Sequence, residues 1–427
     1  MYYRCQSNGD PLMKARQLAY EILYDVIVRK QYASLALKQR LQETPAIDQT
    51  LCTSIVYTCL QNHRYIRALW QKHTTYYPSS KIAVLIDSAT TQLIFFDRVP
   101  DYAVLNETVE LAKNIDLNSA KMVNAVLHRV IEKGKETLVG LDELDTLALN
   151  SSLPTFVVKL WNKHYGYEQT LLNAQALLEP SLLCGRVNPL KIDPDVIFYD
   201  PSVTRGQLSQ YAFYAKDNLV QSEWFKLGEC WLQDEASQHV SELLDVSDNM
   251  MVLDACSAPG TKTAATATLM NNTGHIDAIE IHEIRTELID KQMLHLGITN
   301  VSTYTMDARN TKDTFKHQYY DRILVDVPCS GLGVLRRKAD IKLRVTPSQL
   351  DELVILQAEI LEGVYECLKV GGIMVYSTCT LNRKENEMQI QRFCEKHPEF
   401  ELIEDKTIFP NEYHTDGFYM AKLKRNA

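Results

Sequence analysis

Two cysteines directly follow two short apolar runs that have the length of buried strands. Cys329 follows the run 322–327, within residues 326–331 (DVPCSG), and Cys379 follows the run 372–377, within residues 377–380 (STCT). A cysteine is usually a small buried hydrophobic residue, but its thiolate is a strong nucleophile. Because both thiols are expected at the same edge of one sheet, a chemical role is favoured over two ordinary core residues.

The turn at residues 254–262 (DACSAPGTK), between another apolar run and a helical stretch, could bind polar or anionic groups of a ligand. Amides at the start of a helix point out of such a turn. Its single glycine makes it neither a GxGxxG fingerprint nor a phosphate-binding loop. An ordinary strand–helix turn, with a solvated first-turn lysine, is the alternative. The residues that we predict to contact the ligand are Cys256, Ser257, Ala258, Pro259, Gly260, Thr261 and Lys262.

Two acids stand at the ends of the next two apolar runs. Glu280 lies twenty residues beyond Gly260, the separation at which a doubly wound fold places the acceptor for ribose hydroxyls. Asp307 could lie beside an adenine amino group, although a turn-forming aspartate is an equal alternative at this position. Together with the turn 254–262, these acids indicate a nucleoside pocket.

A thiol pair and a nucleoside pocket together indicate one reaction. The 10 cysteines include no CxxC pair, so zinc is disfavoured, and a disulfide switch would need no nucleoside. When a cysteine adds to carbon 6 of a pyrimidine, carbon 5 becomes electron-rich enough to take a methyl group from S-adenosylmethionine. The adduct then collapses by losing the carbon 5 proton and expelling the thiolate, a step that a second group can assist.

The elements that would position these residues alternate between strands and helices from about residue 229. Apolar runs at 250–255, 275–281, 301–305, 322–327 and 372–377 are separated by helical stretches at 261–270, 284–296 and 349–368. This order is typical of a mostly parallel sheet covered on both faces, which binds ligands at the carboxyl ends of its strands. We therefore predict an α/β domain over residues 229–427. Before it we predict an all-α domain over residues 1–140 and a small α+β segment over 150–228.

Residues 254–262, 326–331 and 377–380 resemble the methyl-donor motif and the two cysteine motifs of RNA 5-methylcytosine methyltransferases. With residues 233–237 (QDEAS) upstream, their order resembles the RsmB branch, also called Fmu or Sun, which methylates small-subunit ribosomal RNA. Further similarity, to the NusB-like N-terminal domain of that branch and to its RNA-contacting segment, lies at residues 32–37, 97–100, 106–113, 123–127 and 186–191. The resemblance implies an all-α NusB-like domain, a small α+β linker domain and a Rossmann-like class I methyltransferase domain.

The resemblance also implies a role for each candidate residue. Cys379 would be the nucleophile on carbon 6, Cys329 the partner in proton loss and product release, and Asp326 the hydrogen-bond partner of the cytosine ring. The residues that would hold S-adenosylmethionine are the turn 256–262, Glu280, Asp307 and Asp326, with Arg285 beside them. Two of these residues depart from the family pattern. Thr261 stands where the family has glycine, and threonine adopts a positive φ only with strain, whereas Glu280 replaces a frequent aspartate.

Five basic residues follow Cys329, after a glycine-containing loop at 331–333 that we expect to be flexible. They are Arg336, Arg337, Lys338, Lys342 and Arg344. Charge runs are usually solvated faces, but this one adjoins the candidate active site and favours contact with phosphates. Because a base must leave its stack to reach a thiol, we expect single-stranded or loop RNA as the partner.

Composition and charge set the outer limits. The 427 residues carry 45 Lys and Arg against 54 Asp and Glu, a net charge of −9, so the chain as a whole is not a general polyanion binder. No run approaches the ~18 apolar residues of a membrane span, and residues 1–13 lack the apolar stretch of a signal peptide. We expect a cytoplasmic monomer with reduced thiols and with no membrane or metal partner.

The leading hypothesis is methylation of carbon 5 of a cytosine in 16S ribosomal RNA. The same chemistry on transfer RNA is an alternative, because the catalytic motifs do not encode the target. A non-catalytic RNA-binding or ribosome assembly factor, and a thiol redox sensor, are the two alternatives from other classes.

Overall fold

The computed structural model describes residues 11–41 and 46–427, which form two compact units. The helical unit comprises the described residues up to Leu178 together with the short segment Lys338–Arg344, and the sheet unit comprises Glu179–Arg337 and Val345–Ala427. Most of the segment 1–13, whose polarity argued against a signal peptide, lies outside the described residues. The domain limits drawn from the sequence at 140, 150 and 229 stay predictions.

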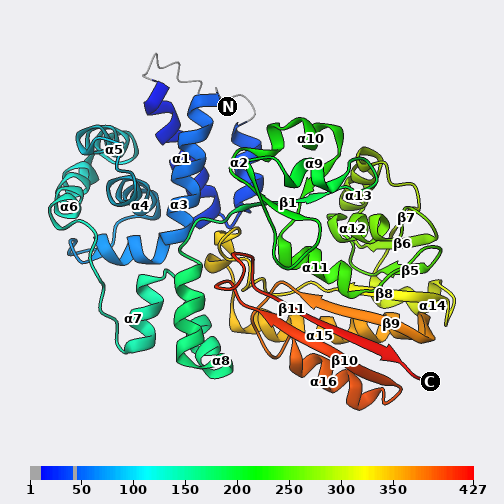
Figure 1. The fold of residues 1–427 in the computed structure, drawn as a ribbon. Helices are drawn as coiled ribbons and strands as arrows, with labels where there is room; N and C mark the ends of the chain where they lie inside the picture. The colour runs from blue at the N-terminus through cyan, green and yellow to red at the C-terminus, as the bar shows by residue number, and fades with distance from the viewer. Residues whose placement is uncertain (1–10, 42–45) are drawn as a thin grey trace. The chain divides into compact units, whose positions relative to one another are not determined.

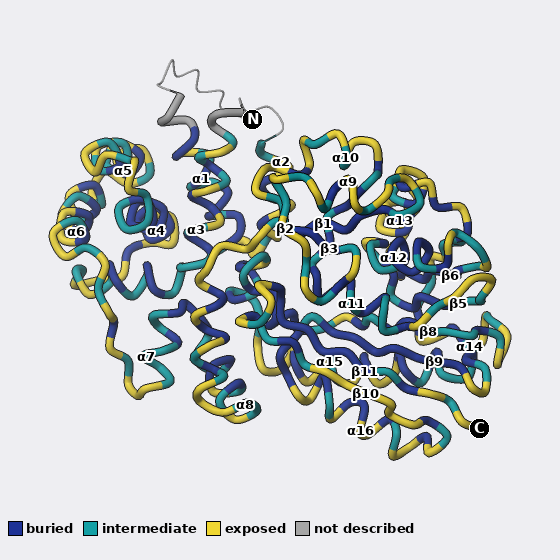
Figure 2. The backbone as a smooth tube through the Cα atoms, in the orientation of Figure 1, coloured by how far each residue is buried: buried dark blue, intermediate teal, exposed yellow. Residues whose placement is uncertain are grey.

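The helical unit is built from helices whose buried stretches appear in dark blue along its tube (Figures 1 and 2). Ile22, Ile55 and Ile86, on three of these helices, have no exposed surface, and the helices themselves confirm the all-α prediction for this part of the chain. The helices are α1 Pro11–Ile27, α2 Ala33–Leu41, α3 Ala46–Gln71, α4 Ser80–Phe95, α5 Asp101–Ile115, η1 Leu117–Ser119, α6 Ala120–Lys133, α7 Glu143–Asn150, α8 Thr155–Ala176 and η4 Ala339–Leu343.

The segment Lys338–Arg344 packs within the helical unit although it is distant from the other residues of that unit in the sequence. Ala339 lies in the core formed by α1, α2 and α3. The Lys342 ammonium is buried and donates to the carbonyl of Gln61 at 2.9 Å. The Arg344 guanidinium lies 3.8 Å from the centre of the Tyr32 ring. These contacts fix the segment by both apolar and polar interactions.

The sheet unit begins with a small antiparallel sheet in the order β2-β3-β1-β4. Its strands are β1 Leu183–Val187, β2 Val203–Arg205, β3 Ala212–Ala215 and β4 Cys230–Leu232, and its helices are α9 Pro194–Phe198, η2 Leu219–Gln221 and α10 Glu223–Leu227. The buried residues Val187, Phe213 and Cys230 form its own core. Strands and short helices in this part of the chain agree with the α+β prediction.

A seven-stranded sheet in the order β10-β11-β9-β8-β5-β6-β7 forms the rest of the sheet unit. The strands β5 to β9 are parallel, and β11 and β10 extend the sheet antiparallel at one edge. The strands are β5 Met251–Asp254, β6 His275–Glu280, β7 Val301–Thr305, β8 Tyr320–Asp326, β9 Leu368–Thr378, β10 Phe400–Ile408 and β11 Phe418–Arg425. The helices are α11 Glu235–Leu243, α12 Thr261–Leu269, α13 Glu283–Leu296, η3 Ala308–Asn310, α14 Thr311–Thr314, α15 Pro347–Val364, η5 Tyr365–Cys367 and α16 Glu387–Lys396.

Helices cover both faces of this sheet, as the predicted apolar runs require (Figure 1). On one face Ile323 and Met374 of the central strands pack with Ile360 of α15. On the other face Leu324 and Val375, the next residue along each strand, pack with helices α11, α12 and α13. A strand buried on both faces reads as a continuous apolar run, and all five runs listed from the sequence are strands. This arrangement confirms the Rossmann-like α/β prediction.

Two features of the sheet unit differ from expectation. The antiparallel strands β10 and β11 were not predicted. The edge strand β10 exposes six consecutive residues and carries four charged ones, so it lacks an apolar run. The loop at 331–333, expected to be flexible, is buried. A Cβ on Gly333 would meet the carbonyl oxygen of Gly417 at 1.9 Å, so this glycine permits a close backbone approach rather than mobility.

The described residues offer neither a membrane-spanning helix nor a cluster of metal ligands. No helix among them is both long enough and apolar enough to cross a membrane. Within the same residues, no group of three or more histidine, cysteine, aspartate or glutamate side chains could hold a metal ion.

The burial of Lys342 makes the stability of the helical unit depend on pH. Burial lowers the pKa of Lys342 to about 7, whereas an unfolded chain keeps this proton up to about pH 10.4. Between these pH values the unfolded state binds more protons, so stability rises with pH across that window, and the full penalty is present below about pH 7. We expect Lys342→Met to raise the midpoint of thermal unfolding at pH 7, with a smaller gain at pH 9.

The matched control is Lys338→Met, because Lys338 is an exposed lysine of the same segment. This variant should leave the midpoint unchanged at both pH values. A lower midpoint for Lys342→Met at pH 7 would mean that the hydrogen bond to Gln61 outweighs the cost of burying the charge.

Candidate active site

The two cysteines singled out from the sequence meet in the structure. Cys329 Sγ and Cys379 Sγ are 3.3 Å apart. They follow β8 and β9, which are parallel neighbours with Asp326 paired to Ser377. The contact with Cys379, together with burial, raises the pKa of the Cys329 thiol well above its usual range. Cys329 therefore stays protonated at neutral pH and can donate its S–H to the neighbouring sulfur.

Asp326, at the end of β8, is held by two partners. The Lys262 ammonium donates to its Oδ2 at 2.7 Å, and the Ser377 hydroxyl donates to its Oδ1 at 2.6 Å. Burial would lower the pKa of Lys262, but the Asp326 carboxylate outweighs burial and raises it, and Cys379 adds to the same effect. Lys262 thus remains charged beside both an acid and a thiol. Ser377 was not identified from the sequence, because a serine within an apolar strand carries no signal of its own.

The turn 256–262 is closed onto the neighbouring strand by Ser257. Both the amide and the hydroxyl of Ser257 donate to the carbonyl of Ile279, at 2.8 and 2.9 Å. Gly260 takes the positive φ of the turn, +98°, and Thr261 begins α12. The threonine therefore occupies ordinary helical backbone. The positive φ belongs to Gly260, which has no β-carbon and adopts it without strain.

The predicted nucleoside ligands lie around this turn. Arg285 connects them, because it pairs with Glu280 at 3.2 Å and donates to the carbonyl of Ala258 at 3.2 Å. Burial, followed by the charges of carboxylates that include Glu280, Asp307 and Asp326, raises the pKa of the Cys256 thiol well above its usual range. All three predicted acids are thus close enough to Cys256 to act on it.

Glu280 and Asp307 differ in their surroundings. Glu280 is buried and accepts the amide of His282 at 3.0 Å. A cavity of about 580 Å³ lies beside it, lined by residues 281–285 and Thr305. Asp307 accepts hydrogen bonds from the backbone and the side chain of Arg309, which hold its pKa below the usual range. Asp307 therefore does form the turn that was its alternative interpretation, while its carboxylate stays ionised.

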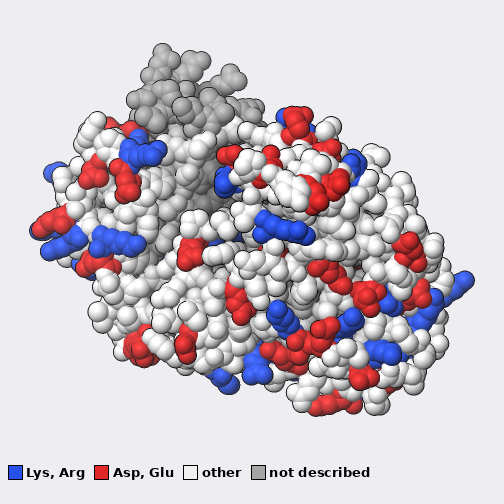
Figure 3. Space-filling model, viewed as in Figure 1, with Lys and Arg blue, Asp and Glu red and all other residues white. Residues whose placement is uncertain are grey.

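The five basic residues after Cys329 do not form one solvated face. Arg337 pairs with Asp234 and Asp416 at 2.9 and 3.0 Å, and Arg336 donates to the carbonyl of Thr415 at 2.6 Å. Lys342 and Arg344 are bound within the helical unit, as described above, and Lys338 is exposed. On the face shown in Figure 3, basic and acidic side chains are interspersed. Phosphate contact by these five residues stays a prediction, and four of them already have partners in the protein.

The segment 186–191 is also engaged internally. Arg186 is fully buried, with its guanidinium 5.0 Å from the centre of the Tyr211 ring. Asn188 donates to the carbonyls of Gly228 and Leu296, at 2.8 and 3.0 Å. These contacts assign the segment a packing role within the sheet unit.

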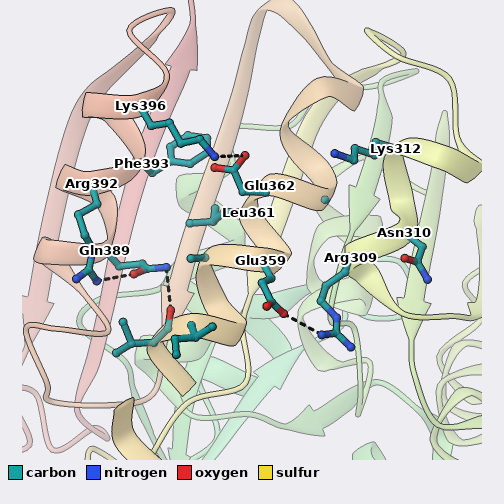
Figure 4. A pocket seen from close by; sticks show the side chains of 14 residues that line it. Arg309, Asn310, Lys312, Glu359, Leu361, Glu362, Gln389, Arg392, Phe393 and Lys396 are labelled. Atoms are coloured by element: carbon teal, nitrogen blue, oxygen red, sulfur yellow. Dashed lines mark hydrogen bonds and ion pairs between the residues drawn. The ribbon is translucent and has the colours of Figure 1, made fainter. Parts of the chain in front are cut away.

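A second cavity, of about 710 Å³, runs along α15 (Figure 4). Its walls come from α16 and from η3 with α14, and apolar side chains such as Phe393 line it. The acids on α15 are paired across it, Glu359 with Arg309 at 2.8 Å and Glu362 with Lys396 at 2.9 Å. None of the residues predicted to act on the substrate or the cofactor lines this cavity.

Comparisons with known proteins agree with this architecture. A family model described as 16S rRNA methyltransferase RsmB/F matches residues 241–424, and the NusB family model matches residues 13–132. The chain is 32% identical to the probable ribosomal RNA small subunit methyltransferase B of Bacillus subtilis (strain 168), over 96% of this chain and 98% of that protein. It is 31% identical to the ribosomal RNA small subunit methyltransferase B of Yersinia enterocolitica, over 77% and 79%. The crystal structure of PH0851 superposes with a TM-score of 0.81 at 23% identity, over 98% of this chain and 100% of that one, which shows the fold alone.

The electrostatic effect between Lys262 and Cys379 leads to a prediction about thiol reactivity. A neighbouring ammonium favours the thiolate form of a cysteine. Lys262→Met keeps the length of the side chain but removes that charge and leaves Asp326 without its cation. We expect alkylation of Cys379 by iodoacetamide at pH 7.5 to slow by about tenfold, the equivalent of roughly 1.4 kcal/mol, as measured by mass spectrometry of the peptide.

Lys369→Met is the matched control, because Lys369 pairs with Asp321 at the same distance of 2.7 Å but at the opposite end of the strands. It should leave the alkylation rate unchanged. An equal rate in Lys262→Met and in the unmodified protein would show that the ammonium does not activate the thiol.

Proposed function

We propose that this chain methylates carbon 5 of a cytosine through a covalent cysteine–pyrimidine adduct. The chain belongs to the RsmB/F family of 16S rRNA methyltransferases. It is a small-subunit ribosomal RNA methyltransferase that uses S-adenosylmethionine. The observation that carries the proposal is the 3.3 Å contact between Cys329 Sγ and Cys379 Sγ, beside the Asp326–Lys262 pair. A single thiol would suffice for attack on a pyrimidine. A second thiol in contact with it adds a group that can assist release.

Cys379 is the nucleophile in this proposal, and a cation close to its sulfur would stabilise a thiolate. The Lys262 ammonium lies close enough for an electrostatic effect between the two groups. Cys329 remains protonated, for the reasons given above, and can donate a hydrogen bond to the Cys379 sulfur. Attack on carbon 6 forms the sulfur–carbon bond and moves the electron pair of the 5,6 double bond towards carbon 5, which becomes the methyl acceptor.

Asp326 would act on the other side of the ring. Its carboxylate can accept a hydrogen bond from the exocyclic amino group of cytosine, which orients the ring for attack. Lys262 and Ser377 fix both of its oxygens. Because these partners are in place before the substrate arrives, little reorganisation is needed when the base enters.

The second half of the reaction releases the Cys379 sulfur from carbon 6. After methyl transfer, carbon 5 loses its proton to a water molecule, and the electron pair of that C–H bond re-forms the 5,6 double bond. The bond between carbon 6 and the Cys379 sulfur breaks, and the electron pair leaves with the sulfur. The Cys329 thiol, already in contact with that sulfur, would stabilise the departing thiolate by hydrogen bonding.

The residues around the turn 256–262 fit a nucleoside cofactor. Glu280, buried beside a cavity, would accept the ribose hydroxyls, and Asp307 would accept the adenine amino group. The backbone of the turn, with Gly260 at positive φ, would hold the polar end. S-Adenosylmethionine, when bound, supplies a methyl group on a positively charged sulfur, and the carboxylates around Cys256 complement that charge.

The covalent step predicts opposite results for the two cysteines. Cys379→Ala should abolish methyl transfer and form no adduct, because no sulfur can reach carbon 6. Cys329→Ala should still attack but release slowly, so a protein–RNA adduct should persist on a denaturing gel with methylated substrate RNA. Cys394→Ala, at a cysteine of α16 outside the site, serves as the control. The absence of any adduct with Cys329→Ala would contradict the two-thiol mechanism.

The target can be determined by bisulfite sequencing of ribosomal and transfer RNA, from cells with and without this gene. We expect one cytosine of the 16S RNA to lose protection from deamination when the gene is deleted. Loss of protection in a transfer RNA, with 16S RNA unchanged, would move the proposal to the alternative substrate.

A further inference from the structure

The residues that directly follow the two cysteines are bonded to each other. Ser330 Oγ and Thr380 Oγ1 are 2.7 Å apart. The amide of Leu332 donates to Thr380 Oγ1 at 3.1 Å, and the amide of Gly333 donates to the carbonyl of Cys379 at 3.1 Å. The loop after β8 and the loop after β9 are therefore joined immediately beside the sulfur pair.

Glu385, which has no exposed surface, lies at the centre of this junction. Its Oε1 accepts the Ser330 hydroxyl at 2.5 Å and the Asn382 amide group at 2.8 Å. Its Oε2 accepts the Ser330 backbone amide at 2.9 Å and the Gln357 amide group at 3.0 Å. Each carboxylate oxygen thus has two neutral donors, an arrangement that an ionised carboxylate satisfies and an amide does not.

The hydrogen bonds also have a defined direction. Ser330 has one hydroxyl proton, which goes to the carboxylate, so the Thr380 hydroxyl must donate to Ser330 Oγ. Thr380 Oγ1 is then an acceptor for the amide of Leu332, as observed. This series of hydrogen bonds runs from the Leu332 amide through Thr380 and Ser330 to Glu385. Any change that reverses one donor interrupts the series.

Stability alone does not account for a charge at this place. Within the part of the chain that the structure describes, Glu385 forms no ion pair, and a carboxylate buried among neutral groups costs more than a well-packed apolar side chain. Two of its four hydrogen bonds come from Ser330, the residue next to Cys329. The carboxylate therefore acts mainly on the loop that carries the Cys329 thiol.

We propose that Glu385 is a positioning residue, which holds the two cysteine loops so that the sulfurs of Cys329 and Cys379 meet. The inference rests on the function proposed above for the sulfur pair. It deepens that function by assigning the 3.3 Å contact to one buried carboxylate outside the two cysteine motifs.

Electrostatics supports the same assignment. After the contact with Cys379 and burial, the Glu385 charge is a further cause that raises the pKa of Cys329. The Glu385 charge thus adds to the effects that keep the Cys329 thiol protonated, whereas the Lys262 ammonium acts on the Cys379 sulfur. Loss of the carboxylate should disturb both the distance between the sulfurs and the difference between them.

The test uses the full chain with Glu385→Gln, which preserves shape but places an amide against donors. We expect kcat for methyl transfer to fall by about 100-fold, with KM for RNA and for the methyl donor within about twofold of the original. A second readout needs neither RNA nor cofactor. Dibromobimane becomes fluorescent when both of its bromomethyl groups have alkylated thiols, and we expect Glu385→Gln to slow its bridging of Cys329 and Cys379 severalfold.

Asp277→Asn is the matched control, because Asp277 is also a buried carboxylate of the sheet unit and accepts the Tyr320 hydroxyl at 2.7 Å, but it touches neither cysteine loop. It should lower thermal stability and leave both readouts unchanged. If Glu385→Gln does not fold, Thr380→Val removes the link to Ser330 with an isosteric side chain and should show the same two effects.

The outcomes separate the two proposals. A folded Glu385→Gln with unchanged kcat and bridging would overturn the positioning role, as would equal losses in Asp277→Asn. An original protein that methylates RNA but is not bridged would overturn it too. A protein whose bridging depends on Glu385, but which methylates no cytosine, would instead remove the proposed function and leave the positioning role standing.

Discussion

The parallel pairing of β8 with β9 is the constraint on which the candidate site depends. Because Asp326 lies opposite Ser377, the chain leaves both strands at the same level, and the residues that follow must share one edge of the sheet. Side chains that alternate between two cores hold this register. A slip by one residue would exchange the two faces, so packing far from the thiols determines that the sulfurs meet.

The sequence predicts this part of the structure because burial on both faces leaves a clear pattern. The five apolar runs are strands, and Cys329 and Cys379 lie next to their ends as their spacing indicates. The partners that orient the site leave no such pattern. Ser377 is an unremarkable residue within a strand, and Glu385 lies in a stretch of charged residues (RKENE) that resembles an exposed turn. Only the fold shows that Glu385 is buried and that its four donors converge.

The basic segment after Cys329 shows a second limit of the sequence. A run of cations predicts a phosphate-binding face only when the cations reach solvent. Here Asp234 and Asp416 bind Arg337, and a backbone carbonyl accepts from Lys342. The sequence records the charge of a side chain but not its partner. The same limit applies to Arg186, whose place in an RNA-contacting segment gave no sign that its guanidinium is enclosed by aromatic rings.

Two buried charges show how the number of partners determines what a charge does. Among the described residues Lys342 has one carbonyl acceptor for its three N–H donors, and burial lowers its pKa to about 7, so it loses its proton at a much lower pH than an exposed lysine. Glu385 has four donors for its two oxygens, and each donor belongs to a segment that must be held. A carboxylate that is so fully bonded cannot move without breaking several hydrogen bonds together. The rigidity needed by two sulfurs in contact therefore follows from the hydrogen bonding of a residue that touches neither of them.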